Sequence, residues 1–115
     1  MSKFNFKKSL LILFVLAVVP FGLKADPAKK VELSFKDGKL KIVAVHPTKN
    51  VNDHYIDQIV IKVDKKDVKE LKFNKQSSAE AQEVEVVIPE IKPGTTVEVK
   101  TRCNKFGFKS GKLQL

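Results

Sequence analysis

The feature that most constrains this chain is the alternation of apolar and polar residues that runs through its C-terminal part. It is clearest between residues 95 and 103, where uncharged side chains alternate with charged ones: Val97, Val99, Thr101 and Cys103 against Glu98, Lys100 and Arg102. A period of two residues puts alternate side chains on opposite faces of the backbone, as in a half-buried strand. The same period recurs over residues 31–35, 40–46, 55–63 and 82–88. We therefore expect strands at these places, and we find no helical period after residue 25.

Turn signals separate these segments. Asp37-Gly38 is a strong short hairpin signal, residues 64–67 form a charged turn, and Pro93-Gly94 precedes the clearest strand. Residues 68–73 indicate a short strand with a slip in register, and residues 113–115 indicate a short edge strand. The polar segments 47–53 and 74–81 are expected to be loops. About seven short strands with frequent turns are typical of an all-β, immunoglobulin-like antiparallel β-sandwich.

The first 25 residues have a different sequence pattern from the rest of the chain. Lysines in the first eight residues precede an unbroken apolar run over residues 10–19, and Pro20 and Gly22 end that run. This pattern predicts a signal helix, with a signal peptide over residues 1–25 that is cleaved after Ala25. The run is shorter than the roughly 20 residues of a membrane span. We therefore expect an exported, periplasmic protein with one domain over residues 26–115, although Leu23 is a mediocre cleavage residue and leaves an uncleaved anchor as the alternative.

The charge of the expected domain is basic but moderate. The whole chain has a formal charge of +9, and four of its 22 basic residues but none of its 13 acidic ones lie in residues 1–25, which leaves +5 for residues 26–115. Lysine dominates, because Arg102 is the single arginine. Lysines without interleaved aromatic residues are a poor footprint for nucleic acid. The pattern indicates a solvated basic surface, or a surface that attracts a small anion.

Residues with the chemistry of metal ligands are few. The chain has two histidines, His46 and His54, and one cysteine, Cys103. Imidazoles and a thiolate are the ligands that proteins use for iron, copper and zinc. Each of the three stands at the expected end of a strand, so they are candidates for one metal site. The alternatives are a buried inert thiol and histidines that serve the structure only.

Two motifs carry a resemblance to a known family. His46-Pro47, followed by His54-Tyr55-Ile56 and later by Cys103-Asn104 and Gly107, resembles the ferrous-iron domain of superoxide reductases and desulfoferrodoxins, the neelaredoxin-like proteins, over residues 29–108 or so. The resemblance implies a mononuclear non-haem iron that is held by four imidazoles and one thiolate, with an open position for superoxide. It also implies that His46 and His54 are two of the imidazole ligands, that Cys103 is the thiolate, and that Lys29 attracts superoxide as a catalytic pocket lysine.

The chain departs from the family at two ligand positions. Lys30 stands where the family has its first histidine, and Phe106 stands where it has its last. Phenylalanine cannot bind a metal and a lysine ammonium has no lone pair, so three of the five ligands remain. A set of two histidines and one cysteine suits copper or zinc better than ferrous iron. We expect Phe106 and Phe108 to fill core space that the lost ligands left.

Three functions remain open from the sequence. The first is an exported superoxide-reductase-like protein of oxidative stress that binds iron, copper or zinc and exchanges electrons with a periplasmic redox protein. The second is a metal-free, immunoglobulin-like binding module of the periplasm that kept the fold and lost the site. The third is a carrier whose Cys103 thiol is covalently loaded. None of them involves nucleic acid or a stable membrane span after signal cleavage.

Overall fold

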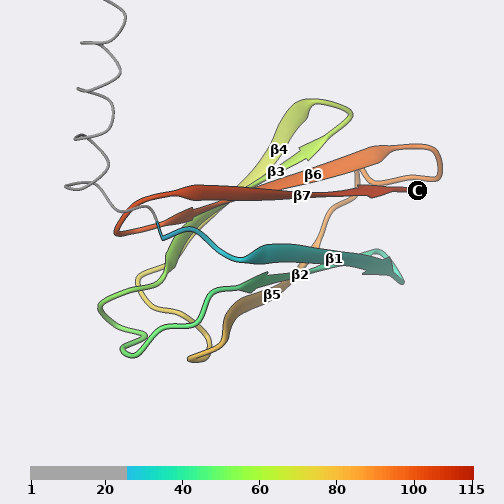
Figure 1. The fold of residues 1–115 in the computed structure, drawn as a ribbon. Coiled ribbons are helices and arrows are strands. Elements are labelled where there is room, and N and C mark those ends of the chain that lie inside the picture. The colour runs from blue at the N-terminus through green and yellow to red at the C-terminus, as the bar shows by residue number, and fades with distance from the viewer. Residues whose placement is uncertain (1–25) are drawn as a thin grey trace, which may run out of the picture.

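Residues 26–115 form a two-layer antiparallel β-sandwich in the computed structural model, which describes these residues (Figure 1). The seven strands are β1 (Lys30–Lys36), β2 (Lys39–Val45), β3 (Ile56–Val63), β4 (Lys66–Lys72), β5 (Ala81–Val87), β6 (Thr96–Cys103) and β7 (Phe108–Gln114). The predicted immunoglobulin-like all-β class is thus confirmed. The predicted signal peptide over residues 1–25 lies outside the described residues. Within residues 26–115 no helix has the length and apolarity that a membrane crossing requires.

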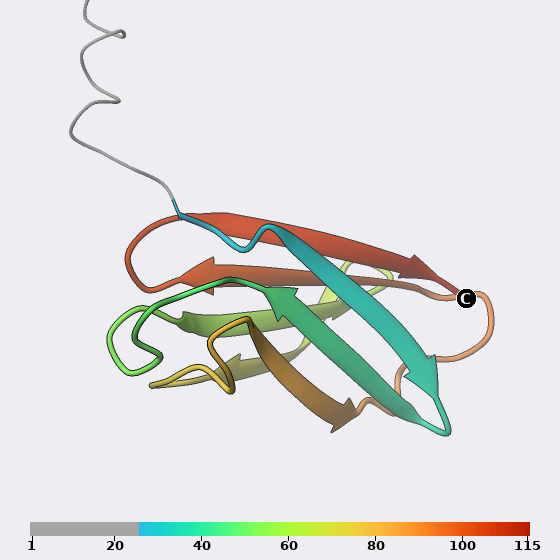
Figure 2. The same ribbon diagram turned by 60° about the horizontal axis from the view of Figure 1, so that its bottom comes forward.

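The strands divide into a three-stranded and a four-stranded sheet. The smaller sheet has the order β1-β2-β5 and the larger the order β4-β3-β6-β7. Figure 2 shows the smaller sheet lying across one face of the larger. The two sheets are in close contact where β1 meets β7: a Cβ on Gly111 would lie 2.5 Å from the Val31 carbonyl oxygen. A glycine is therefore needed where the two layers close.

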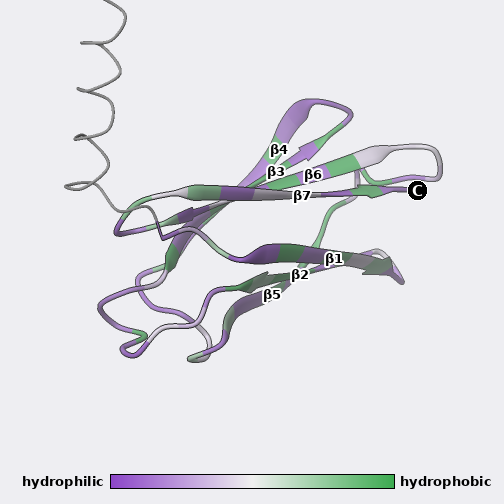
Figure 3. Ribbon diagram, in the orientation of Figure 1, coloured by the Kyte–Doolittle hydropathy of each residue, from purple (hydrophilic) through white to green (hydrophobic). Residues whose placement is uncertain are grey.

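The core lies between the sheets and follows the predicted alternation. Leu40, Ile42 and Ala44 of β2 and Val97 and Val99 of β6 belong to one core cluster, and all five are fully buried. Hydrophobic and hydrophilic residues are interleaved along the strands (Figure 3). Burying one such aliphatic side chain stabilises a fold by about 1.5–3 kcal/mol, so a short strand with three inward residues is enough to hold its place.

Two hairpin turns follow from local chemistry. Asp37 and Gly38 have φ values of 53° and 79°, and Asp64 and Lys65 have 49° and 72°. Two successive residues with positive φ make the turn that matches the twist of neighbouring strands, and Asp-Gly adopts it readily. The expected slip in register is present as a shift between Ile61 and Lys62 in the pairing of β3 with β4. The last strand is longer than predicted, because β7 pairs with β6 along its whole length from Phe108 to Gln114.

A second irregularity lies at the start of β3. The pairing of β3 with β6 shifts between Ile56 and Gln58, so both Ile56 and Ile59 point into the core although they are three residues apart. Asp57 at this irregularity accepts two hydrogen bonds from the Arg102 guanidinium, at 2.9 and 3.0 Å. These bonds, together with the charge of Asp57, raise the pKa of Arg102. The ion pair holds the start of β3 against the end of β6, directly beside the candidate ligands.

The expectation that Phe106 and Phe108 fill core space is wrong. Their side chains are 53% and 55% exposed. Phe106 lies in the turn between β6 and β7, and Phe108 lies on the outer face of β7 with the ammonium of Lys100 4.6 Å from its ring centre. Their aromatic side chains therefore belong to the surface next to the end of β6, and the fully buried core between the sheets is mainly aliphatic, with Phe35 and Phe73 packed against it.

Candidate metal centre

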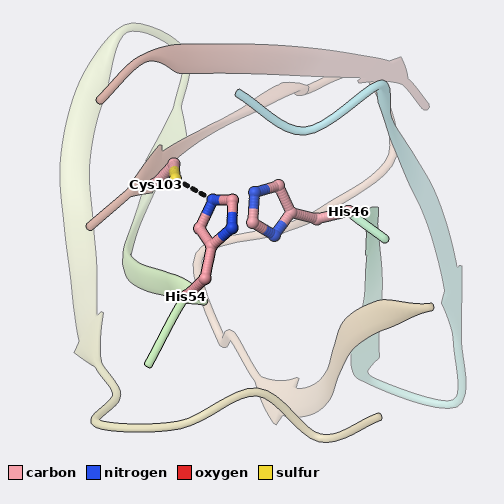
Figure 4. A group of neighbouring side chains, drawn as sticks. All are labelled: His46, His54 and Cys103. Atoms are coloured by element: carbon pink, nitrogen blue, oxygen red, sulfur yellow. Dashed lines mark hydrogen bonds between the residues drawn. The ribbon is translucent and has the colours of Figure 1, made fainter. Parts of the chain in front are cut away.

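The three predicted ligands come together at one end of the sandwich. His46 directly follows β2, His54 precedes β3 by two residues, and Cys103 is the last residue of β6. Their ligand atoms all lie within 4.8 Å of one another. Figure 4 shows the two imidazole rings and the sulfur pointing toward a common point from three separate segments. The cluster joins the two sheets, because β2 belongs to the smaller sheet and β3 and β6 to the larger.

Cys103 and His54 are in direct contact. The sulfur lies 3.2 Å from Nε2 of His54 and 3.4 Å from the backbone amide nitrogen of Lys105, which donates to it. Cys103 is 2% exposed. The rings of His46 and His54 meet edge to face with their centres 4.8 Å apart. A buried sulfur that accepts a backbone N–H is positioned as a thiolate ligand is, and its burial counts against the reading of Cys103 as a covalently loaded carrier.

Gln76 determines which nitrogen of His46 is available. The Gln76 amide nitrogen donates to the carbonyl oxygens of His46 at 2.7 Å and Ser78 at 3.0 Å, so its oxygen faces Nδ1 of His46 at 2.8 Å. That oxygen also accepts from the Ile56 amide at 3.2 Å. Because an amide oxygen only accepts, Nδ1 of His46 carries the hydrogen that it donates. Nε2 is then the nitrogen with a lone pair to offer, which is how outer residues orient an imidazole ligand.

Asn104 ties the two loops of the centre together. Its backbone amide donates to the Tyr55 carbonyl at 3.0 Å, and its side-chain oxygen accepts from the Tyr55 amide at 2.9 Å. Its side-chain nitrogen donates to the Asp53 carbonyl at 3.0 Å. These bonds hold the residues on either side of His54. The residue after Cys103 therefore fixes the position of the histidine that contacts Cys103.

The remaining residues of the predicted site lie away from this cluster. The Lys29 amide donates to the Val45 carbonyl at 2.7 Å, which brings its backbone near His46, while its side chain is exposed. The Lys30 ammonium pairs with Glu32 at 3.1 Å, and both side chains are more than half exposed. The Phe106 side chain is also exposed. The two positions that the family uses for further histidines thus supply no side chain to the cluster here.

The donor set decides which ion fits. A centre with four imidazoles and one thiolate cannot be built from the residues present, so the iron site of the family does not fit this chain. With metal–sulfur and metal–nitrogen bonds of about 2.3 and 2.0 Å, two ligand atoms of one tetrahedral ion lie about 3.5 Å apart. The 3.2 Å between Nε2 of His54 and the sulfur of Cys103 is close to that value. The other pairs of ligand atoms, which are up to 4.8 Å apart, would have to move closer when an ion binds. Two imidazoles and a thiolate are a set for copper or zinc.

An open depression lies beside His54, and its charges are mainly negative. It is lined by three carboxylates, those of Asp26, Asp53 and Glu80, and by one lysine, Lys49, and the ammonium of Lys105 pairs with Asp53 at 3.6 Å. A rim with this balance attracts cations and repels anions. The surface next to the cluster therefore favours the entry of a metal ion over the steering of superoxide, in contrast to the basic charge of the chain as a whole.

Sequence reasoning did not single out Gln76, Asn104 or Asp26. Gln76 lies in a polar loop that has no periodicity, and its contact with His46 spans 30 residues. Asn104 belongs to the Cys-Asn motif, which could have drawn attention to it. Asp26 is the first residue of the expected domain. No protein-family model, no curated protein and no solved structure matches this chain.

Proposed function

We propose that this chain is an exported protein that binds one transition-metal ion through His46, His54 and Cys103. The observation that supports it is the convergence of two imidazoles and a buried sulfur, from three strand ends, within 4.8 Å. Iron is the ion that the resemblance implies, and copper or zinc is the ion that the donor set favours. The proposal includes the periplasm as the compartment, as the N-terminal segment predicts.

The residues around the cluster support binding by preparing it for an ion. Gln76 holds the His46 ring with Nε2 toward the site, so the ring is already oriented in the folded protein before an ion binds. Asn104 and the ion pair of Arg102 with Asp57 fix the two strand ends that carry His54 and Cys103. An arrangement that is largely formed before binding loses little entropy when the ion arrives.

Superoxide reduction is the reaction that the resemblance implies, and we propose it as the activity of the protein with a redox-active ion bound. Such an ion would supply the one-electron chemistry, while Cys103 is kept from bulk water by its burial. The acid-lined depression does not help an anion to approach. The activity therefore needs its own measurement: superoxide consumption by the metal-loaded wild type, with Cys103→Ser as the inactive reference.

Metal content tests the binding itself. The full chain, purified anaerobically in the form in which cells produce it, should contain close to one metal ion per chain and show a thiolate charge-transfer band if the ion is copper or ferric iron. Cys103→Ser should lose both, because it removes the thiolate ligand. The hydroxyl that replaces the thiol has a similar shape, so the change in packing is small. Thr101→Ser is the matched control: it lies two residues earlier on the same inward face of β6, and the serine retains a hydroxyl for the bond to the Lys109 carbonyl.

Two results would contradict this function. One is a wild type that takes up no metal when copper, zinc and ferrous iron are each supplied. The other is a metal content that Cys103→Ser and Thr101→Ser leave equally unchanged. Binding should also appear in stability, because an ion present at 100 times its dissociation constant stabilises the fold by about 2.7 kcal/mol.

A metal-free binding module is the second candidate, and one observation favours it. His54 is hydrogen-bonded to Cys103 and paired with Asp26, so much of the cluster is satisfied by its own residues. Thermal unfolding with and without a chelator separates the two functions. A bound ion predicts a melting temperature that falls by about 10 °C or more with chelator, whereas a module without metal predicts no change.

A further inference from the structure

Asp26 brings two oxygen atoms to the two candidate histidines. Its carboxylate Oδ2 lies 2.9 Å from Nε2 of His54, and its backbone carbonyl oxygen lies 3.1 Å from Nε2 of His46. The same His54 nitrogen is 3.2 Å from the sulfur of Cys103. One residue at the start of the described chain therefore touches both imidazoles of the cluster, and it does so through the nitrogens that face the site.

The atoms that meet at this point have more lone pairs than hydrogens. The sulfur of Cys103 and the Nε2 atoms of His46 and His54 are joined by a carboxylate oxygen and a carbonyl oxygen from Asp26. The Nδ1 hydrogen of His46 is used by Gln76, so in the neutral ring Nε2 meets the Asp26 carbonyl oxygen, 3.1 Å away, with its lone pair. A cation bound among these atoms would find several lone pairs directed at it.

The position of Asp26 is set by contacts with both sheets. Its amide donates to the Phe106 carbonyl at 2.8 Å, in the turn that follows Cys103. Gly107 has a φ of +117°, and a Cβ on it would lie 2.8 Å from Cδ of Pro27, so the absence of a side chain there lets Pro27 lie against the turn. Three residues later, the Lys29 amide donates to the carbonyl oxygen of Val45, the last residue of β2, at 2.7 Å. The segment is thereby held across the cluster.

We propose that Asp26 is the fourth donor of the metal centre, an inference that rests on the proposed metal binding. Its carboxylate completes a set of two nitrogens, one sulfur and one oxygen for a copper or zinc ion. Histidine, cysteine and aspartate are each ligands of zinc, and a weak fourth oxygen beside two histidines and a cysteine is found with copper. The carboxylate of Glu80 lines the same depression and favours the approach of a cation, while that of Asp53 is paired with Lys105.

Cobalt(II) is a suitable probe, since its visible bands are strong in four-coordinate sites and weak in five- or six-coordinate ones. The metal-free full chain is titrated with cobalt(II), and zinc(II) and copper(II) are then used as competitors. The wild type should give a four-coordinate spectrum with a thiolate band in the near ultraviolet. Asp26→Ala should keep the thiolate band, shift the visible bands because water replaces the carboxylate, and bind about 100-fold more weakly. Asp26→Asn, which keeps one oxygen, should fall between the two.

Glu80→Gln is the matched control. It removes one negative charge from the same depression, while the backbone carbonyl of Glu80, which accepts from the His46 amide at 2.9 Å, stays in place. It should weaken binding by about fivefold at most and leave the spectrum unchanged, as expected for a charge that acts through solvent. Asp26 is half exposed near the end of the described chain, so its variants should remain folded.

The outcomes separate this inference from the proposed function. Asp26 variants that bind like Glu80→Gln, with the wild-type spectrum, would overturn the fourth-donor role and leave a metal centre made by three residues. A wild type that gives no thiolate band with any of the three ions would overturn both. Displacement of cobalt by zinc or by copper, combined with the loss in Asp26→Ala, supports the role and identifies the preferred ion.

Discussion

Replacing Gln76 by methionine should damage both the fold and the metal centre. Methionine is close to glutamine in length and is flexible enough to fill the same space, so the change removes hydrogen bonds and leaves little cavity. The Gln76 side chain is 2% exposed and takes part in four hydrogen bonds. Two of them are accepted by its oxygen, from His46 and the Ile56 amide, and two are donated by its nitrogen, to the carbonyls of His46 and Ser78.

The expected loss can be worked out from these bonds. A buried polar group that loses its partner costs about 1–3 kcal/mol. The His46 ring nitrogen and the Ile56 amide lose their acceptor in the buried part of the loop, and the two carbonyls lose a donor. We expect the free energy of unfolding to fall by about 3–5 kcal/mol. For a domain of this size the melting temperature should then fall by about 15 °C or more.

Gln82→Met provides the control, because Gln82 has the same burial and a similar role without touching His46. It is 2% exposed, donates to the carbonyls of Ile56 at 3.1 Å and Lys75 at 2.9 Å, and accepts from the Ser77 amide at 3.0 Å. Urea unfolding should show a comparable loss in both variants. Nitrogen NMR of the imidazole should show mixed hydrogen positions on His46 in Gln76→Met alone, and metal affinity should fall about 10- to 100-fold in that variant only.

A fall in unfolding free energy of less than about 1 kcal/mol in Gln76→Met would refute the account of a fully used buried amide. Equal effects of Gln76→Met and Gln82→Met on the His46 ring and on metal affinity would refute the orienting role, since both variants would then act through the loop alone. Either result would remove the reason for regarding Nε2 of His46 as the nitrogen prepared for a metal.

The structure predicts the effects of three further experiments, on the exposed phenylalanines, on Gly111 and on Cys103. Phe106→Ser and Phe108→Ser should change the free energy of unfolding by about 0.5 kcal/mol or less, because both rings are more than half exposed, and a large loss in a urea titration would contradict that placement. Gly111→Ala should destabilise by about 1–3 kcal/mol, since the new Cβ meets the Val31 backbone, and an unchanged midpoint would show that β1 and β7 can separate without cost. In the native protein Cys103 should react with an alkylating reagent far more slowly than in urea, and equal rates would contradict its burial.

The metal-ligand candidates were accessible to sequence reasoning because their chemistry is rare in this chain. With two histidines and one cysteine there were few alternatives, and the placement of each at a strand end suggested that they meet. What could not be foreseen was the environment of the cluster. Phe106 was expected in the core because its residue type is apolar, yet it lies in the turn between β6 and β7 and its side chain is exposed.

The strands, their inward faces and the turn at Asp37-Gly38 were determined by the sequence itself, since each depends on residues within a few positions of one another. The roles of Gln76 and Asp26 were decided only by the tertiary structure. Gln76 lies 30 residues from His46 in the sequence, and Asp26 lies 20 residues from it. No local sequence pattern indicates contacts over such separations. A period of two residues determines which face of a strand a side chain takes, but only the pairing of distant strand ends brings the Gln76 amide to His46 and a carboxylate and a sulfur to His54.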